Sequence, residues 1–145
     1  MTITTQRAAN VWRPRILCAD DDRDIGATVQ AILADEGYDV SCLFEITDDA
    51  LHREIRRLEP DCILLDSASS TNYNRSWTAA AWIRNRRRTV PVVMFSAHLA
   101  DSLEAEANLT LRAREAGFAA VLLKPFSIDE LVSAVRIAVA QSVHA

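Results

Sequence analysis

Cysteine and histidine are scarce in this sequence, and neither follows a pattern that marks a disulfide framework or a metal site. The cysteines are odd in number and lack Cys-x-x-Cys spacing, which argues against both disulfides and zinc. The histidines have no partners at ligand spacing. These residues are Cys18, Cys42, Cys62, His52, His98 and His144. We therefore expect the cysteines to be small buried hydrophobic residues in a reducing cytoplasm.

Long apolar runs are absent as well. No stretch approaches the ~20 apolar residues that cross a bilayer, and residues 1–13 lack the hydrophobic region of a signal peptide. We expect residues 1–13 to form an N-terminal extension and the protein to be cytoplasmic, without membrane binding. The net charge of −4 argues against direct binding of nucleic acid by this chain.

Lysine is nearly absent. Of the 16 basic residues, 15 are arginines and one is Lys124. This lysine closes the apolar run 121–123 and precedes Pro125. Since the chain uses arginine wherever else it needs a cation, a compact ammonium here indicates a position that a planar guanidinium would not fit.

The rest of the composition is that of one globular domain. The chain has 145 residues, of which 50% are hydrophobic and 25% charged. This length is enough for one substantial core. We predict a single domain over residues 14–142.

Short apolar runs alternate with stretches of helical periodicity, which is typical of repeated strand–helix units. Strands are predicted at residues 15–19, 39–44, 62–65, 91–95 and 119–123. Helices are predicted at residues 23–36, 47–58, 75–87, 99–116 and 127–141, the last with a capping box of Ser127 and Glu130. Right-handed crossovers would give an α/β fold, a three-layer αβα sandwich.

Polar residues follow four of the predicted strands. They are Asp20, Asp21 and Asp22 after the first strand, Asp66 after the third, Ser96 after the fourth and Lys124 after the fifth. Because ligands bind at the carboxyl ends of parallel strands, these residues should meet in one crevice. Carboxylates, a hydroxyl and an ammonium there indicate a site for a divalent cation and a phosphoryl group. Taken singly, the acidic triplet could instead stabilise a helix N-terminus, and Asp66 could cap a loop.

These fragments resemble the receiver domain of two-component response regulators, of the chemotaxis-regulator type. The matching pieces are residues 16–22, 63–66, 91–97 and 116–126. The resemblance implies a flavodoxin-like fold with five helices and a five-stranded parallel sheet in the order 2-1-3-4-5. It also implies a cis bond before Pro125.

The resemblance assigns a role to each site residue. It implies that Asp66 accepts the phosphoryl group, and that Lys124 and Ser96 bind phosphoryl oxygens. The implied Mg²⁺ ligands are Asp20, Asp21, Asp66 and the backbone carbonyl of Ala68. Asp22 is expected to cap the first helix instead. The chemistry is sound, because a carboxylate can attack phosphorus once a cation neutralises the approach.

The resemblance also implies partners. The phosphoryl group would come from a sensor histidine kinase or a histidine phosphotransfer protein, and phosphorylation would switch binding of a downstream protein that the sequence does not identify. A homodimer is possible. The chain would catalyse only its own phosphorylation and dephosphorylation, and so would not otherwise be an enzyme.

The chain departs from the family pattern in three places. Residues 67–75 replace a Met-Pro pair and a glycine, the segment 96–117 is longer than usual, and Val121 stands where the family has a Tyr or Phe switch residue. We therefore predict that activation reorders residues 67–75 and 98–108 instead of an aromatic ring.

Two alternative functions remain open from the residues. The chain could be a degenerate receiver that acts as a binding module without phosphorylation. It could also be a haloacid-dehalogenase-like phosphatase, because Asp20, Asp22, Ser96 and Lys124 imitate the first three motifs of that family. The phosphatase interpretation would leave Asp66 without a role. The sequence also lacks the fourth, acidic motif that this interpretation requires.

Overall fold

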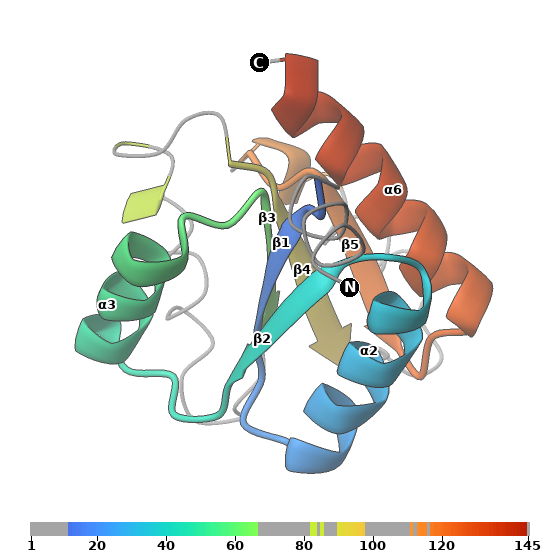
Figure 1. Cartoon of the computed structure of the whole chain (residues 1–145), viewed down its shortest axis with the longest axis horizontal. Helices are drawn as coiled ribbons and strands as arrows, with labels where there is room; N and C mark the ends of the chain where they lie inside the picture. Colours follow the sequence, from blue (N-terminus) through green and yellow to red (C-terminus); the bar gives the residue numbers. More distant parts are fainter. Residues whose placement is uncertain are drawn as a thin grey trace, which may run out of the picture.

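Five parallel strands form the central layer of the computed structural model, which describes residues 12–66, 82–83, 85, 90–97, 111, 113–115 and 117–144 (Figure 1). The strands are β1 (Arg15–Ala19), β2 (Asp39–Leu43), β3 (Cys62–Asp66), β4 (Val92–Ala97) and β5 (Ala120–Lys124). Their order in the sheet is β2-β1-β3-β4-β5, as predicted, and every pair is parallel. All five predicted strands are confirmed; the bounds of β1 agree with the prediction, and those of the other four differ from it by one or two residues.

Three helices lie fully within the described residues: α2 (Arg23–Asp35), α3 (Asp48–Leu58) and α6 (Ile128–His144). Figure 1 shows α2 and α6 on one face of the sheet and α3 on the other. The predicted helices at 75–87 and 99–116 fall mostly outside the described residues, within which residues 82, 83, 85, 111 and 113–115 are helical. None of the described helices is long and apolar enough to cross a membrane.

The core is divided by the sheet into two clusters, because successive side chains of a strand point to opposite faces. Ile16 and Cys18 of β1 pack beneath α2 and α6, whereas Leu17 and Ala19 pack beneath α3. The central strand β3 is buried along its whole length. A strand that is buried on both faces has a continuous apolar sequence, so the sequence itself indicates that the strand ends at Asp66.

Local sequence signals mark the end of α2 and the start of α6. Gly37 has a φ of +95° after α2, a conformation that glycine adopts without strain. At the start of α6, the Glu130 N–H donates to the Ser127 hydroxyl and the Ser127 N–H donates to the Glu130 carboxylate, each at 3.0 Å. The predicted capping box is therefore confirmed.

Candidate phosphoryl and cation site

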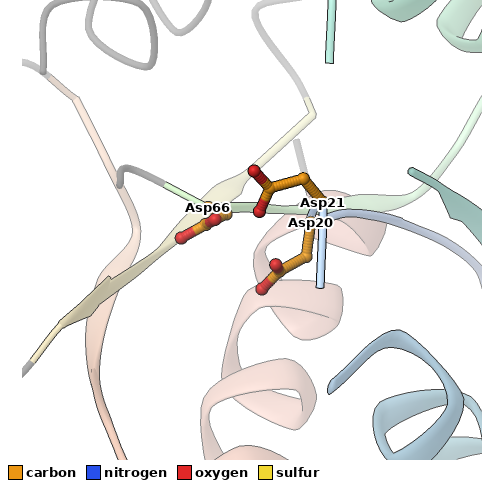
Figure 2. A group of neighbouring side chains, drawn as sticks. All are labelled: Asp20, Asp21 and Asp66. Carbon is orange, nitrogen blue, oxygen red and sulfur yellow. The ribbon is translucent and has the colours of Figure 1, made fainter. Parts of the chain in front are cut away.

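Three carboxylates meet at the carboxyl end of the sheet (Figure 2). One oxygen from each of Asp20, Asp21 and Asp66 lies within 4.8 Å of the others. Asp20 and Asp21 follow β1, and Asp66 ends β3, which pairs directly with β1. Asp20 and Asp66 are only 1% and 7% exposed, whereas Asp21 is exposed. The cluster therefore reaches solvent through Asp21.

Lys124 joins two of these carboxylates. Its Nζ atom donates to Asp20 Oδ2 at 2.9 Å and to Asp66 Oδ1 at 3.1 Å. Burial lowers the pKa of Lys124, but the hydrogen bonds and charges of Asp20 and Asp66 outweigh that effect and raise the pKa above its ordinary value. The lysine is therefore a fixed cation at neutral pH. The Lys124–Pro125 bond is cis, as predicted.

Ser96 lies between these groups in the sheet. It belongs to β4, which separates β3 from β5. The strand register places Asp66 opposite Phe95 and Lys124 opposite Ala97, so that Ser96 sits at the same end of the sheet as both. Ser96 is 6% exposed. A hydroxyl at this level can donate to an anion bound between Asp66 and Lys124.

Asp22 has a different task from its two neighbours. Its carboxylate accepts from the N–H groups of Asp24 and Ile25 at 2.9 and 3.2 Å, so it is the N-cap of α2. Its own N–H donates to Asp20 Oδ1 at 2.9 Å. The predicted role of Asp22 is confirmed. The helix-terminus interpretation of the acidic triplet therefore holds for Asp22, and the carboxylate cluster consists of the other two with Asp66.

Several predicted features lie outside the described residues. They are the Ala68 carbonyl, His98, and the whole of the segments 67–75 and 98–108. Val121 is described. It is half-buried, lies opposite Met94 in the sheet and packs against the core beneath α3.

The thiols depart from the sequence-based expectation. Cys18 and Cys62 are fully buried, but Cys42 is half-buried, so the prediction that all three are buried is wrong for Cys42. Cys42 lies on β2 at the edge of the sheet, where only one neighbouring strand covers it. The β1–β2 register places it directly opposite Cys18. No spacing rule in the sequence pairs these two residues.

The cluster fits a hard divalent cation. Carboxylate oxygens are the ligands that Mg²⁺ prefers, and Mg²⁺ usually keeps several waters, which the exposed side at Asp21 permits. Three carboxylates against one ammonium also leave a surplus of negative charge that a cation relieves. Ser96 and Lys124 add a hydroxyl donor and a cation for an anionic group beside it.

This combination of sheet order, flanking helices and acidic cluster defines a flavodoxin-like receiver fold. The family description "Response regulator receiver domain" matches residues 16–136, and the chain belongs to this family. It is a receiver domain of two-component signal transduction. Receiver domains generally bind Mg²⁺ at an acidic pocket, interact with histidine kinases or phosphotransfer proteins, and are not classical enzymes. The phosphatase alternative has no support from this match.

Curated relatives are bacterial. The chain is 32% identical over 139 residues to the transcriptional regulatory protein PdtaR of Mycobacterium tuberculosis, covering 95% of this chain and 62% of that protein. It is 29% identical over 128 residues to the transcriptional regulatory protein DltR of Streptococcus agalactiae, covering 88% of this chain and 53% of that protein. The chain thus spans less than two thirds of the length of these relatives.

Solved structures agree with the fold. NtrX from Brucella abortus superposes with a TM-score of 0.77 at 26% identity, over 92% of this chain and 28% of that one. The receiver domain of the Francisella response regulator 1452 gives a TM-score of 0.71 at 26% identity, over 92% of this chain and 100% of that one.

Proposed function

We propose that Asp66 accepts a phosphoryl group from a sensor histidine kinase or a histidine phosphotransfer protein, and that this switches binding of a downstream protein. The observation that carries the proposal is the placement of the Asp66 carboxylate, which is 7% exposed and 3.1 Å from the ammonium of the chain's single lysine. The proposal includes a cytoplasmic location and allows a homodimer.

The transfer is a substitution at phosphorus. A carboxylate oxygen of Asp66 forms a bond to the phosphorus of a phosphohistidine, the P–N bond breaks, and the imidazole nitrogen leaves with the electron pair. Lys124 then exchanges its hydrogen bond with the Asp66 carboxylate for one with a phosphoryl oxygen, and the Ser96 hydroxyl donates to another. Positioning and charge neutralisation supply most of the rate.

Asp20, Asp21 and Asp66 would hold Mg²⁺, with the Ala68 carbonyl as a further ligand. When bound, the ion supplies positive charge that lets a phosphoryl dianion approach the carboxylates. Asp20 is the most buried of these and is already paired with Lys124, which supports indirect contact to the ion through water for Asp20 and direct contact for Asp21. The ends of β1 and β3 fix the spacing of the ligands before any ion binds.

The decisive experiment is labelling with acetyl phosphate and Mg²⁺, followed by mass spectrometry. We expect one phosphoryl group on the wild-type chain and none on Asp66→Asn. Asp49→Asn, a change to an exposed aspartate in the first turn of α3, is the matched control and should be labelled normally. Unchanged labelling of Asp66→Asn would overturn the assignment, and an unlabelled wild-type chain would favour the degenerate receiver.

A further inference from the structure

Cys18 and Cys42 lie directly opposite each other on neighbouring strands. The β1–β2 register pairs them, and both belong to the side of the sheet that packs beneath α2 and α6. Neighbouring strands lie about 4.8 Å apart, and the Cα atoms of a disulfide are usually about 4.4–6.8 Å apart. The strand spacing is therefore compatible with a disulfide between these two residues.

The Cys42 thiol also touches α2. Its Sγ atom donates to the Gly26 carbonyl at 3.4 Å, while the strand register keeps the residue opposite Cys18. A Cβ at Gly26 would lie 2.7 Å from the Phe44 ring, which is too close, and 3.7 Å from the Cys42 sulfur, which is an ordinary contact distance. The glycine therefore makes room for Phe44, and the Cys42 thiol lies against the same part of α2.

The pair is asymmetric in its exposure. Cys42 is half-buried on the edge strand, so a small oxidant can reach it, whereas Cys18 is 0% exposed. Cys62 is also 0% exposed and lies opposite Ile16, in the same core cluster as Cys18 but paired with a different residue of β1. The fold thus provides one partly exposed thiol, one buried thiol opposite it on the neighbouring strand, and a third thiol that serves as an internal reference.

The acidity of the thiols also favours oxidation of Cys42 before the other two cysteines. The pKa of Cys42 is lowered to about 7, because its thiolate accepts the hydrogen bond from Cys18 and this outweighs the effect of burial. Burial raises the pKa of Cys62 to about 12. Since the thiolate is the nucleophile in thiol oxidation, we expect Cys42, which is also the most exposed of the three, to react first.

We propose that Cys42 and Cys18 form a redox-active dithiol that hydrogen peroxide converts into a disulfide between β2 and β1. The Cys42 thiolate attacks one peroxide oxygen, the O–O bond breaks, and the departing hydroxide takes a proton to become water, which leaves a sulfenic acid. The Cys18 sulfur then attacks the Cys42 sulfur, the S–O bond breaks, and the Cys18 proton and the hydroxide leave as a second water. Sulfur is oxidised and peroxide is reduced.

The sequence makes the test direct, because trypsin places each cysteine on its own peptide. Cys18 lies in 16–23, Cys42 in 24–53 and Cys62 in 58–75. The folded full-length chain is treated with hydrogen peroxide, then unfolded and blocked with N-ethylmaleimide, digested and analysed by mass spectrometry. We expect peptides 16–23 and 24–53 to become linked, with loss of both thiols, while the thiol of 58–75 remains free to take up N-ethylmaleimide. Cys62→Ser should give the same linked pair.

Single substitutions separate the role of Cys42, which peroxide oxidises, from that of Cys18, which closes the disulfide. Cys42→Ser should keep the Cys18 thiol through the treatment, and Cys18→Ser should stop at a Cys42 sulfenic acid that dimedone traps on peptide 24–53. The wild-type chain and Cys62→Ser decide the question even if Cys18→Ser does not fold. Preferential oxidation of Cys62, links only between two chains, or Cys42 oxidised without a link to Cys18 would each overturn the proposal.

Discussion

The ammonium of Lys124 lies 2.9 Å from the Oδ2 atom of Asp20, a side chain that is itself completely shielded from solvent. The same ammonium reaches Asp66, so one cation offsets two buried carboxylates. A buried carboxylate without a partner would be strongly disfavoured. In the unphosphorylated protein, Lys124 therefore has a structural role as well as its proposed role toward the phosphoryl group.

Replacing Lys124 should strengthen Mg²⁺ binding while it impairs phosphorylation. In Lys124→Met the carboxylates lose their internal cation, so their mutual repulsion is relieved only by the metal. We expect Mg²⁺ affinity to rise roughly tenfold, equivalent to about 1.4 kcal/mol, in an isothermal or NMR titration. Arg136→Met, on the exposed face of α6, is the control. Weaker Mg²⁺ binding by Lys124→Met would show that the lysine does not compete with the ion.

The raised pKa of Lys124 predicts a loss of stability at alkaline pH. A lysine whose folded pKa exceeds its ordinary value of 10.5 stabilises the fold fully below that value, and this contribution is lost as pH rises through the folded pKa. Urea denaturation across this range should show a steeper decline in the free energy of unfolding for wild type than for Lys124→Met. The pKa of Tyr38 is raised from 10.0 by burial, so Tyr38→Phe is needed to subtract its own alkaline contribution. Parallel wild-type and Lys124→Met curves would contradict the prediction.

Asp21 and Asp22 are neighbours that should separate cleanly by mutation. Asp22→Ala removes the N-cap of α2 and should cost about 1 kcal/mol of stability, with phosphorylation intact. Asp21→Ala should abolish phosphorylation by acetyl phosphate without loss of stability, because it removes one of three mutually repelling carboxylates. Thermal unfolding and labelling measured on both variants decide the matter. The reverse pattern would mean that the metal ligands are assigned in the wrong register.

Oxidation of the thiol pair should weaken Mg²⁺ binding, provided both proposals hold. Cys18 is two residues from Asp20, and the Asp20 N–H donates to the carbonyl of Leu43, the residue after Cys42, at 3.1 Å. A bond of about 2.05 Å between the sulfurs would draw these strand ends together and displace the Asp20 carboxylate. The Mg²⁺ affinities of reduced and oxidised protein are compared, with peroxide-treated Cys42→Ser as the control. Equal affinities before and after oxidation would refute the coupling.

Activation is predicted to act on residues 67–75 and 98–108, since Val121 offers no ring to reorient. Val121 is half-buried within the core beneath α3, where a branched aliphatic side chain has little room to change place. Hydrogen exchange with and without beryllofluoride, a mimic of the phosphoryl group, is the measurement. Changes in protection should concentrate in the two segments. Changes limited to β5 and α6 would contradict this prediction.

The positions of the site residues could be predicted because they depend on local signals. Four apolar runs end at a polar residue, and parallel strands bring those ends to one edge, so the sequence alone groups Asp20, Asp66, Ser96 and Lys124. Asp22 could be separated from Asp21 because an N-cap has a fixed place at the start of a helix.

The contacts that depend on register could not be predicted. A shift of one residue between β1 and β2 would move Cys42 to the opposite face of the sheet from Cys18, and nothing in the sequence excludes that shift. The half exposure of Cys42 could have been expected, because the predicted strand order already placed β2 at the edge of the sheet. The double hydrogen bond of Lys124 depends on a side-chain conformation, whereas the sequence indicated only its place at the end of β5.

The separation of the site residues along the chain has a consequence for biosynthesis. Lys124 is 104 residues from Asp20 and 58 from Asp66, so the buried carboxylates gain their cation only when β5 joins the sheet. Contacts of such long range are costly to form, because closing a long loop loses chain entropy. A ribosome makes the chain from its N-terminus, and Lys124 follows Asp66 by 58 residues. A nascent chain therefore carries its aspartates long before its lysine, and under the proposed function it becomes a competent acceptor only after β5 has been made.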